Sequence, residues 1–236
     1  MVDASAARLE ALFTIVDFDL RDTLTDILNQ SNMPFYLLMH GQGSAKSAIY
    51  DILGYGGPKK IVSISMQTKN MSSHIMKQLH NEMAFNKPGT GIAFTVSLSS
   101  ISSVLSETLK HADENLKIGS EDMTPAANES YHLIAAIVNN GFFDQVMEVA
   151  KAAGATGGTL VHARGLGSED GVKYLGITIQ PEKDLVLILT TKEKRRDIME
   201  SITREVGLNK DGKGLCFSLP VNEAFGMGAT LDIDAF

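Results

Sequence analysis

Hydrophobic and polar positions along the chain predict the same succession of elements twice. In the first half, four short apolar runs have the length and alternation of strands. They are Leu12–Val16, Phe35–Met39, Ile61–Met66 and Ile92–Leu98. Two segments between these runs carry apolar residues three and four positions apart, which is typical of one helix face. These are Leu20, Leu24, Ile27 and Leu28, and then Ile75, Met76, Leu79 and Met83. The predicted order is β-α-β-β-α-β.

The second half repeats this order with its apolar positions in register. Strands are predicted at residues 133–138, 159–165, 185–189 and 215–221. The matching helical positions are Phe142, Val146, Val149 and Ala150, and then Ile198, Met199, Ile202 and Val206. Two sets of four core positions in register indicate an internal duplication, which we describe as a first and a second repeat.

Strands and helices in this order form the split β-α-β, or ferredoxin-like, fold. We therefore expect an α+β protein of two tandem ferredoxin-like units, each an antiparallel four-stranded sheet with both helices on one face. The expected domains are residues 1–117, which include a short C-terminal helix, a polar linker at 118–130, and residues 131–236. Because strand positions on the other sheet face remain partly apolar, we expect the repeats to pack together, within a chain or between chains.

Composition narrows the class of protein. The chain has 236 residues, 44% of them hydrophobic, which suits two cores of ordinary size. A formal net charge of −7 argues against nucleic acid as the main partner. One cysteine fits a reducing cytoplasm. Because neither a signal peptide nor an apolar run of about 20 residues is recognisable, we expect a cytoplasmic protein without membrane insertion.

Each repeat carries a glycine turn before its last strand. In the second repeat it is Gly212-Lys213-Gly214, and in the first it is Gly89-Thr90-Gly91. Glycines serve where the backbone turns at positive φ or approaches another group closely. A loop whose N–H groups point one way also binds anions. Two interpretations therefore stand: a tight turn with a solvated lysine, or an anion-binding site.

Two histidines occupy equivalent positions at the end of the second strand of each repeat. They are His40 and His162. Imidazole suits zinc or nickel, so one interpretation is a metal or ligand site. The other is a polar residue inherited by both copies at a contact between repeats. No catalytic triad and no carboxylate pair in a glycine-rich pocket can be assigned, so an enzyme is not expected.

The second repeat resembles the PII family of nitrogen-regulatory signalling proteins. The resemblance rests on Ala163-Arg164-Gly165-Leu166-Gly167, on Gln180-Pro181, and on Gly212-Lys213-Gly214 with the strand that comes after it. The first repeat keeps less of the pattern, in His40-Gly41-Gln42-Gly43 and Gly89-Thr90-Gly91.

The resemblance implies a non-enzymatic sensor that binds ATP or ADP between subunits and presents a loop to a target protein. Carried over to this chain, Gly165, Leu166 and Gly167 lie on the adenine side and Gly212, Lys213 and Gly214 face phosphates. In the first repeat, Gly43 and Gly89-Thr90-Gly91 take the corresponding places.

The leading hypothesis is a tandem PII-like signal-transduction protein in nitrogen regulation. It binds a small anionic effector, an adenine nucleotide or another small anion, at clefts between repeats and regulates a partner protein. If the working ring contains three repeats, the total number of repeats in the assembly must be divisible by three. Three chains of two repeats each are the smallest assembly that meets this condition, so a homotrimer is expected. The alternative is a ferredoxin-like metal-binding or metal-tolerance protein that uses His40 and His162.

Overall fold

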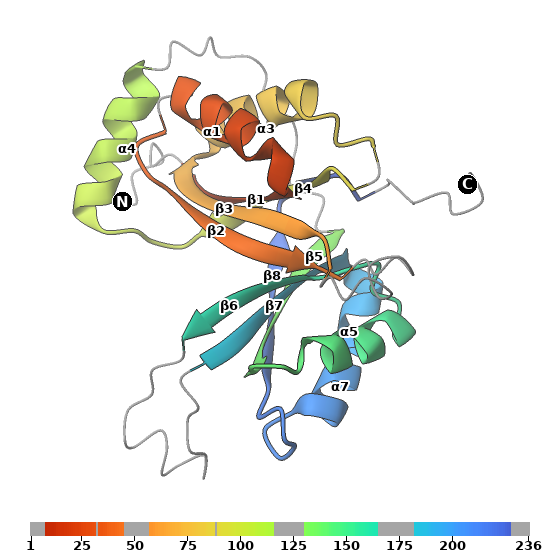
Figure 1. Ribbon diagram of the computed structural model, residues 1–236. Helices are drawn as coiled ribbons and strands as arrows, with labels where there is room; N and C mark the ends of the chain where they lie inside the picture. Colours follow the sequence, from red (N-terminus) through yellow and green to blue (C-terminus); the bar gives the residue numbers. More distant parts are fainter. Residues whose placement is uncertain are drawn as a thin grey trace. The chain divides into compact units, whose positions relative to one another are not determined.

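The computed structural model describes residues 8–31, 33–44, 57–87, 89–115, 130–164 and 182–227. The chain forms two compact units, each built from strands and helices in an α+β arrangement (Figure 1). The first unit comprises residues 1–39, 61–128 and 221–236, and the second comprises 40–60 and 129–220.

The described part of the first unit contains sheet strands and the helices α1, α3 and α4. Its strands lie in the order β2-β3-β1-β4-β9. Their bounds are β1 Leu9–Asp17, β2 Tyr36–Gly43, β3 Lys59–Thr68, β4 Gly91–Leu98 and β9 Glu223–Phe225. The helices are α1 Arg21–Gln30, α3 Lys69–Glu82 and α4 Ser103–Asn115, with a 3-10 turn at Phe18–Leu20. The predicted short helix after the last strand of the first repeat is confirmed as α4.

In its described residues, the second unit has strands in the order β8-β5-β7-β6 and the helices α5 and α7. The strands are β5 Tyr131–Asn139, β6 Thr159–Arg164, β7 Glu182–Thr191 and β8 Leu215–Val221. The helices are α5 Phe143–Ala152 and α7 Lys192–Val206. Strand β7 pairs antiparallel with both β5 and β6. The end of β2 adds to this sheet, with Gln42 opposite Leu160 and Gly43 opposite Thr159.

The compact units do not follow the sequence-based domain boundaries in two places. Residues 223–225 were expected in the second domain, but they pair with β4 and lie in the first unit. Residues 40–44 were expected in the first domain, but they lie in the second unit, where Gln42 and Gly43 pair with β6. Both differences arise from backbone pairing at the open edges of sheets, which carries no signal in hydrophobic periodicity. Most of the expected linker lies outside the described residues.

In each unit, the apolar residues of the strands and helices form a core between the sheet and its helices. In the first unit, Leu12 and Val16 of β1 pack with helix residues of α1 and α3, among them Leu24 and Leu79. In the second, Ile134 and Val138 of β5 pack with α5 and α7 residues such as Val146 and Ile202. These side chains are at most about one per cent exposed. Burial of each contributes roughly 1.5–3 kcal/mol to folding.

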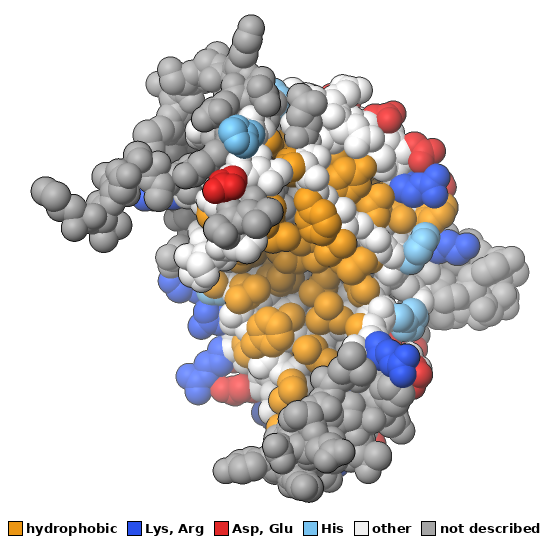
Figure 2. All heavy atoms as spheres, turned by 90° about the vertical axis from the view of Figure 1, so that its left-hand side faces the viewer, with side chains coloured by type: hydrophobic (Ala, Val, Ile, Leu, Met, Phe, Trp, Pro, Cys, Tyr) orange, Lys and Arg blue, Asp and Glu red, His pale blue; other side chains and the backbone are white. Residues whose placement is uncertain are grey.

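Some large hydrophobic side chains remain exposed. Figure 2 shows a face of the molecule on which hydrophobic side chains gather. Across the described residues, the exposed large hydrophobics are Phe35, Leu37 and Leu38 in the first unit, and Leu215 and Phe217 in the second. Exposed apolar area of this kind is typical of interaction surfaces. None of the described helices is long and apolar enough to cross a membrane.

Candidate functional site

The glycine turn of the second repeat is held tightly at the end of α7. The N–H of Gly214 donates to the carbonyl of Val206 at 2.7 Å, and that of Lys213 donates to the carbonyl of Lys210 at 3.0 Å. A Cβ on Gly214 would lie 2.5 Å from the Val206 carbonyl oxygen, and one on Gly212 would lie 2.9 Å from the Val206 Cβ. Both glycines are therefore required by close approach. Lys213, with φ of +46°, adopts the left-handed conformation.

Asn139, at the end of β5, fastens this turn to the sheet. Its backbone N–H donates to the Gly212 carbonyl at 2.8 Å, and its side-chain amide donates to the Asp211 carbonyl at 2.9 Å. The ammonium group of Lys183 on β7 donates to the Asn139 Oδ1 at 2.6 Å. Burial lowers the pKa of Lys183. Lys183, Lys210 and Lys213 therefore place three cationic groups on or beside one turn.

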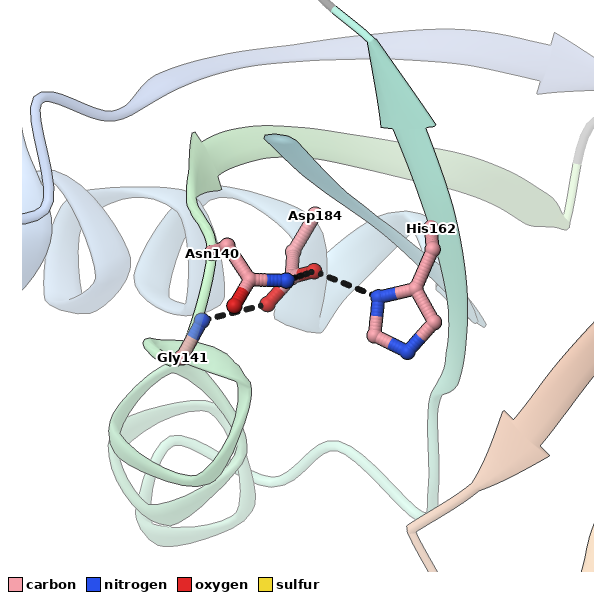
Figure 3. A network of polar contacts seen from close by, with 4 residues as sticks. All are labelled: Asn140, Gly141, His162 and Asp184. Carbon is pink, nitrogen blue, oxygen red and sulfur yellow. Dashed lines mark hydrogen bonds and ion pairs between the residues drawn. The ribbon is translucent and has the colours of Figure 1, made fainter. Parts of the chain in front are cut away.

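A second polar network lies at the same end of the sheet, where β6 and β7 meet the start of α5 (Figure 3). The Asp184 side chain is 2% exposed and lies 3.0 Å from Nδ1 of His162. Asp184 also accepts hydrogen bonds from the Asn140 amide at 3.2 Å and from the Gly141 N–H at 2.9 Å. These three donors satisfy the buried carboxylate. The ring of His162 is oriented by this bond, while its side chain stays 68% exposed.

The glycine turn of the first repeat has a different construction. Gly89 and Gly91 adopt φ of +82° and +145°, so here the glycines themselves supply the positive φ. A Cβ on Gly91 would lie 2.1 Å from the Ile15 carbonyl oxygen. The Thr90 carbonyl accepts a hydrogen bond from the Asp17 N–H at 2.9 Å, which attaches the turn to the end of β1.

Comparison with known families and structures bears on the second repeat. Residues 131–227 match the family model of nitrogen regulatory protein P-II. The match runs from β5 to β9 and includes the turn at Gly212–Gly214. It confirms the resemblance drawn from the sequence of the second repeat.

Solved structures with detectable similarity include two small proteins. The divalent ion tolerance protein CutA1 from Ehrlichia chaffeensis is 11% identical, with a TM-score of 0.36 over 46% of this chain and 97% of that one. The GlnK–ATP complex of B. subtilis is 18% identical, with a TM-score of 0.31 over 42% of this chain and 97% of that one. No match to a curated protein sequence was found.

The structure brings together only part of the predicted site within the P-II segment. Gly212, Lys213 and Gly214 form one turn beside Asn139. Gly165, Leu166 and Gly167 lie outside the described residues. Gly43, predicted as their counterpart in the first repeat, donates its N–H to the Pro58 carbonyl at 2.8 Å.

The two histidines predicted as metal ligands both lie in the second unit. Each has an exposed side chain. Within the part of the chain that the structure describes, no group of three His, Cys, Asp or Glu side chains is placed to hold a metal ion. Burial raises the pKa of the Cys216 thiol to about 11, so at neutral pH it is a protonated packing residue.

Sequence reasoning missed Asp184, Asn140, Asn139 and Lys183. A signal for Asp184 was present, because it precedes Val186 and Ile188 in a two-residue alternation that faces the core. A carboxylate at a core-facing strand position is a reason to look for donors. Asn139 and Lys183 belong to no motif, and their roles arise from pairing between β5 and β7.

Proposed function

We propose that this chain is a tandem PII-like regulatory protein. It consists of two ferredoxin-like units, binds a small anionic effector and regulates a partner protein in the control of nitrogen metabolism. The observation that carries the proposal is the P-II family match over residues 131–227. The lengths of equivalent elements support the duplication, since α1 and α5 have equal length, as do β3 and β7.

The best-supported ligand class is an anion, with ATP and ADP as the first candidates. Lys210 and Lys213 belong to the turn of the second repeat, and Lys183 is attached to it through Asn139. The N–H groups of Lys213 and Gly214 already donate to backbone carbonyls. Anion binding at this turn therefore depends on lysine ammonium groups more than on a cradle of backbone N–H groups.

Regulation, rather than catalysis, fits the chemistry of the described residues. Cys216 is a protonated thiol at neutral pH, and Asp184 is engaged by three donors. Effector binding would select one conformation of the protein for its target.

We further propose that the protein acts in the cytoplasm as a homotrimer of two-repeat chains. Light scattering tests the assembly, and a stable monomer would contradict it.

Isothermal titration tests the effector directly. ATP, ADP, AMP, 2-oxoglutarate and bicarbonate are titrated into the full chain. We expect binding of an adenine nucleotide, and a loss of about 10- to 100-fold in affinity in Lys213→Ala, since a charge-assisted hydrogen bond contributes roughly 1.5–3 kcal/mol. Lys87→Ala is the matched control, because Lys87 precedes the turn of the first repeat, outside the P-II match.

Absence of heat with every one of the five compounds would remove the effector from the proposal. An equal loss of affinity in Lys213→Ala and Lys87→Ala would show that binding is not confined to the second repeat. Chromatography of the titrated mixture detects turnover of the nucleotide. Turnover would show that the protein is an enzyme and would overturn the regulatory assignment.

A further inference from the structure

His40 and His162 are brought to neighbouring strands by the pairing of β2 with β6. The paired positions are Gln42 with Leu160 and Gly43 with Thr159, and the Ser44 N–H extends the register by donating to the Gly158 carbonyl at 2.9 Å. His40 lies two residues before Gln42, and His162 lies two residues after Leu160. In an antiparallel register these are opposing positions, and residues two apart on a strand share a face. Continued two residues past the last paired positions, this register brings both histidines to one side of the two strands.

The proton on His162 is fixed by its surroundings. Asp184 accepts hydrogen bonds from the Asn140 amide and the Gly141 N–H, so its carboxylate acts as an acceptor toward all its neighbours. The contact of 3.0 Å with Nδ1 of His162 therefore needs a proton on that nitrogen. In neutral imidazole, this leaves the lone pair on Nε2. Figure 3 shows Nε2 on the side of the ring that points away from Asp184.

A carboxylate behind the non-ligating nitrogen is the usual support of a metal-binding histidine. It sets the tautomer, orients the ring and raises the basicity of Nε2. The negative charge of Asp184 also favours a nearby cation. Asp184 corresponds to Ile61 in the first repeat, so the position that supports His162 is held there by a buried apolar side chain.

We propose that His40 and His162 together bind a divalent transition-metal ion, just beyond the last paired residues of β2 and β6, with Asp184 as a positioning residue. Imidazole nitrogens suit Zn²⁺, Ni²⁺ and Cu²⁺, and each bond is about 2 Å long. The described residues offer no third histidine, cysteine or carboxylate ligand. Water fills the other coordination positions, so the site has moderate affinity. Its two histidine ligands are not residues of the glycine turn, and the proposed metal binding does not depend on the proposed effector.

The test uses the full chain without a histidine tag. Ni²⁺ is titrated calorimetrically, and Cu²⁺ is added for electron paramagnetic resonance. We expect one equivalent bound with moderate affinity and a copper spectrum with two imidazole nitrogens. His40→Ala and His162→Ala each weaken binding by at least about 10-fold, and Asp184→Asn weakens it by about 10- to 100-fold. His74→Ala, on α3 of the first unit, is the matched control and leaves the affinity unchanged.

Two results would overturn the proposal. One is wild-type affinity in either His40→Ala or His162→Ala, and the other is a copper spectrum with a single imidazole. Nitrogen-15 NMR of the ring separates positioning from a merely structural role of Asp184. In the wild type the proton resides on Nδ1 of His162, and in folded Asp184→Asn it shifts toward Nε2. Retention of the wild-type tautomer in the variant would exclude Asp184 as the positioning residue. ATP titration in the same variants reports on the proposed effector site independently.

Discussion

The last strands of the two repeats begin from similar sequences and end in different environments. Phe94 on β4 is fully buried and stacks on Phe13, with ring centroids 5.1 Å apart. Phe217, its counterpart on β8, is 45% exposed. Strand β4 is covered by β9, with Phe94 opposite Ala224, whereas β8 ends the strand order of its sheet. Phe94 is thus a core residue on a strand with neighbours at both edges, whereas Phe217 is a surface residue on the strand that ends its sheet.

The opposite ends of the repeats diverge in their polar chemistry. Both carry a histidine near the end of the second strand, and in the second repeat the buried carboxylate of Asp184 lies beside it. The first repeat has Ile61 at that position, which packs into the hydrophobic core. The two repeats therefore share an order of strands and helices, while the position of this buried carboxylate is apolar in the first.

The largest expected effect comes from truncating the two equivalent phenylalanines. Phe94→Ala should lower the free energy of unfolding by about 3–5 kcal/mol, because it empties a fully buried site. Phe217→Ala should lower it by at most about 1 kcal/mol, since nearly half of that side chain is already in water. Urea denaturation of the two variants measures the difference. Equal losses would mean that β8 is covered in solution as β4 is.

The glycine turns provide the second test. Gly91→Ala should destabilise the first unit by about 2–4 kcal/mol, because the new Cβ meets the Ile15 carbonyl at a strained φ. Gly89→Ala is the matched control: it has positive φ but no atom within 4 Å of its Cβ, and should cost only about 1–2 kcal/mol. A similar loss in both variants would show that conformation alone, not close approach, requires these glycines.

The smallest expected effect concerns β9, which covers β4. Burial and then the neighbouring Glu10 carboxylate raise the pKa of Glu223, while Lys69 opposes the shift. A raised carboxyl pKa stabilises the fold below the unfolded pKa of about 4.3, and this contribution is lost as pH rises through the folded value. Glu223→Gln should therefore raise Tm at pH 7 and leave it nearly unchanged at pH 4.

The control for this variant is Glu107→Gln on the exposed surface of α4, which should leave Tm unchanged at both pH values. A lower Tm for Glu223→Gln at pH 7 would show that the ionised carboxylate supports β9 and would reverse the assignment.

Hydrophobic spacing predicted most of the strands and helices, because the buried face of a strand or helix requires apolar residues at a regular spacing along the sequence. Both repeats form their strands and helices in the predicted order. Strand β9 was not predicted, since a three-residue strand such as Glu223–Phe225 is too short for a periodic pattern. Its existence depends on the open edge of β4, a tertiary feature.

The candidate site was predicted less completely than the fold. The motif predicted the glycine turn at residues 212–214. It did not predict that Val206, the last residue of α7, leaves no room for a Cβ at Gly212 or Gly214. His162 was found by repetition, whereas Asp184 was missed because the predicted strand began one residue later, at Leu185. Polar networks depend on partners from several strands, and spacing along one strand does not identify them.

Under the proposed function, the second repeat holds the effector-binding turn and the first does not. Hydrogen–deuterium exchange of the full chain, with and without saturating ADP, tests this difference most directly. ADP is expected to slow exchange in peptides covering residues 207–216 and to leave the equivalent peptides at 84–93 unchanged. Slowed exchange at 84–93 alone, or no change in either region at saturation, would contradict the proposed function.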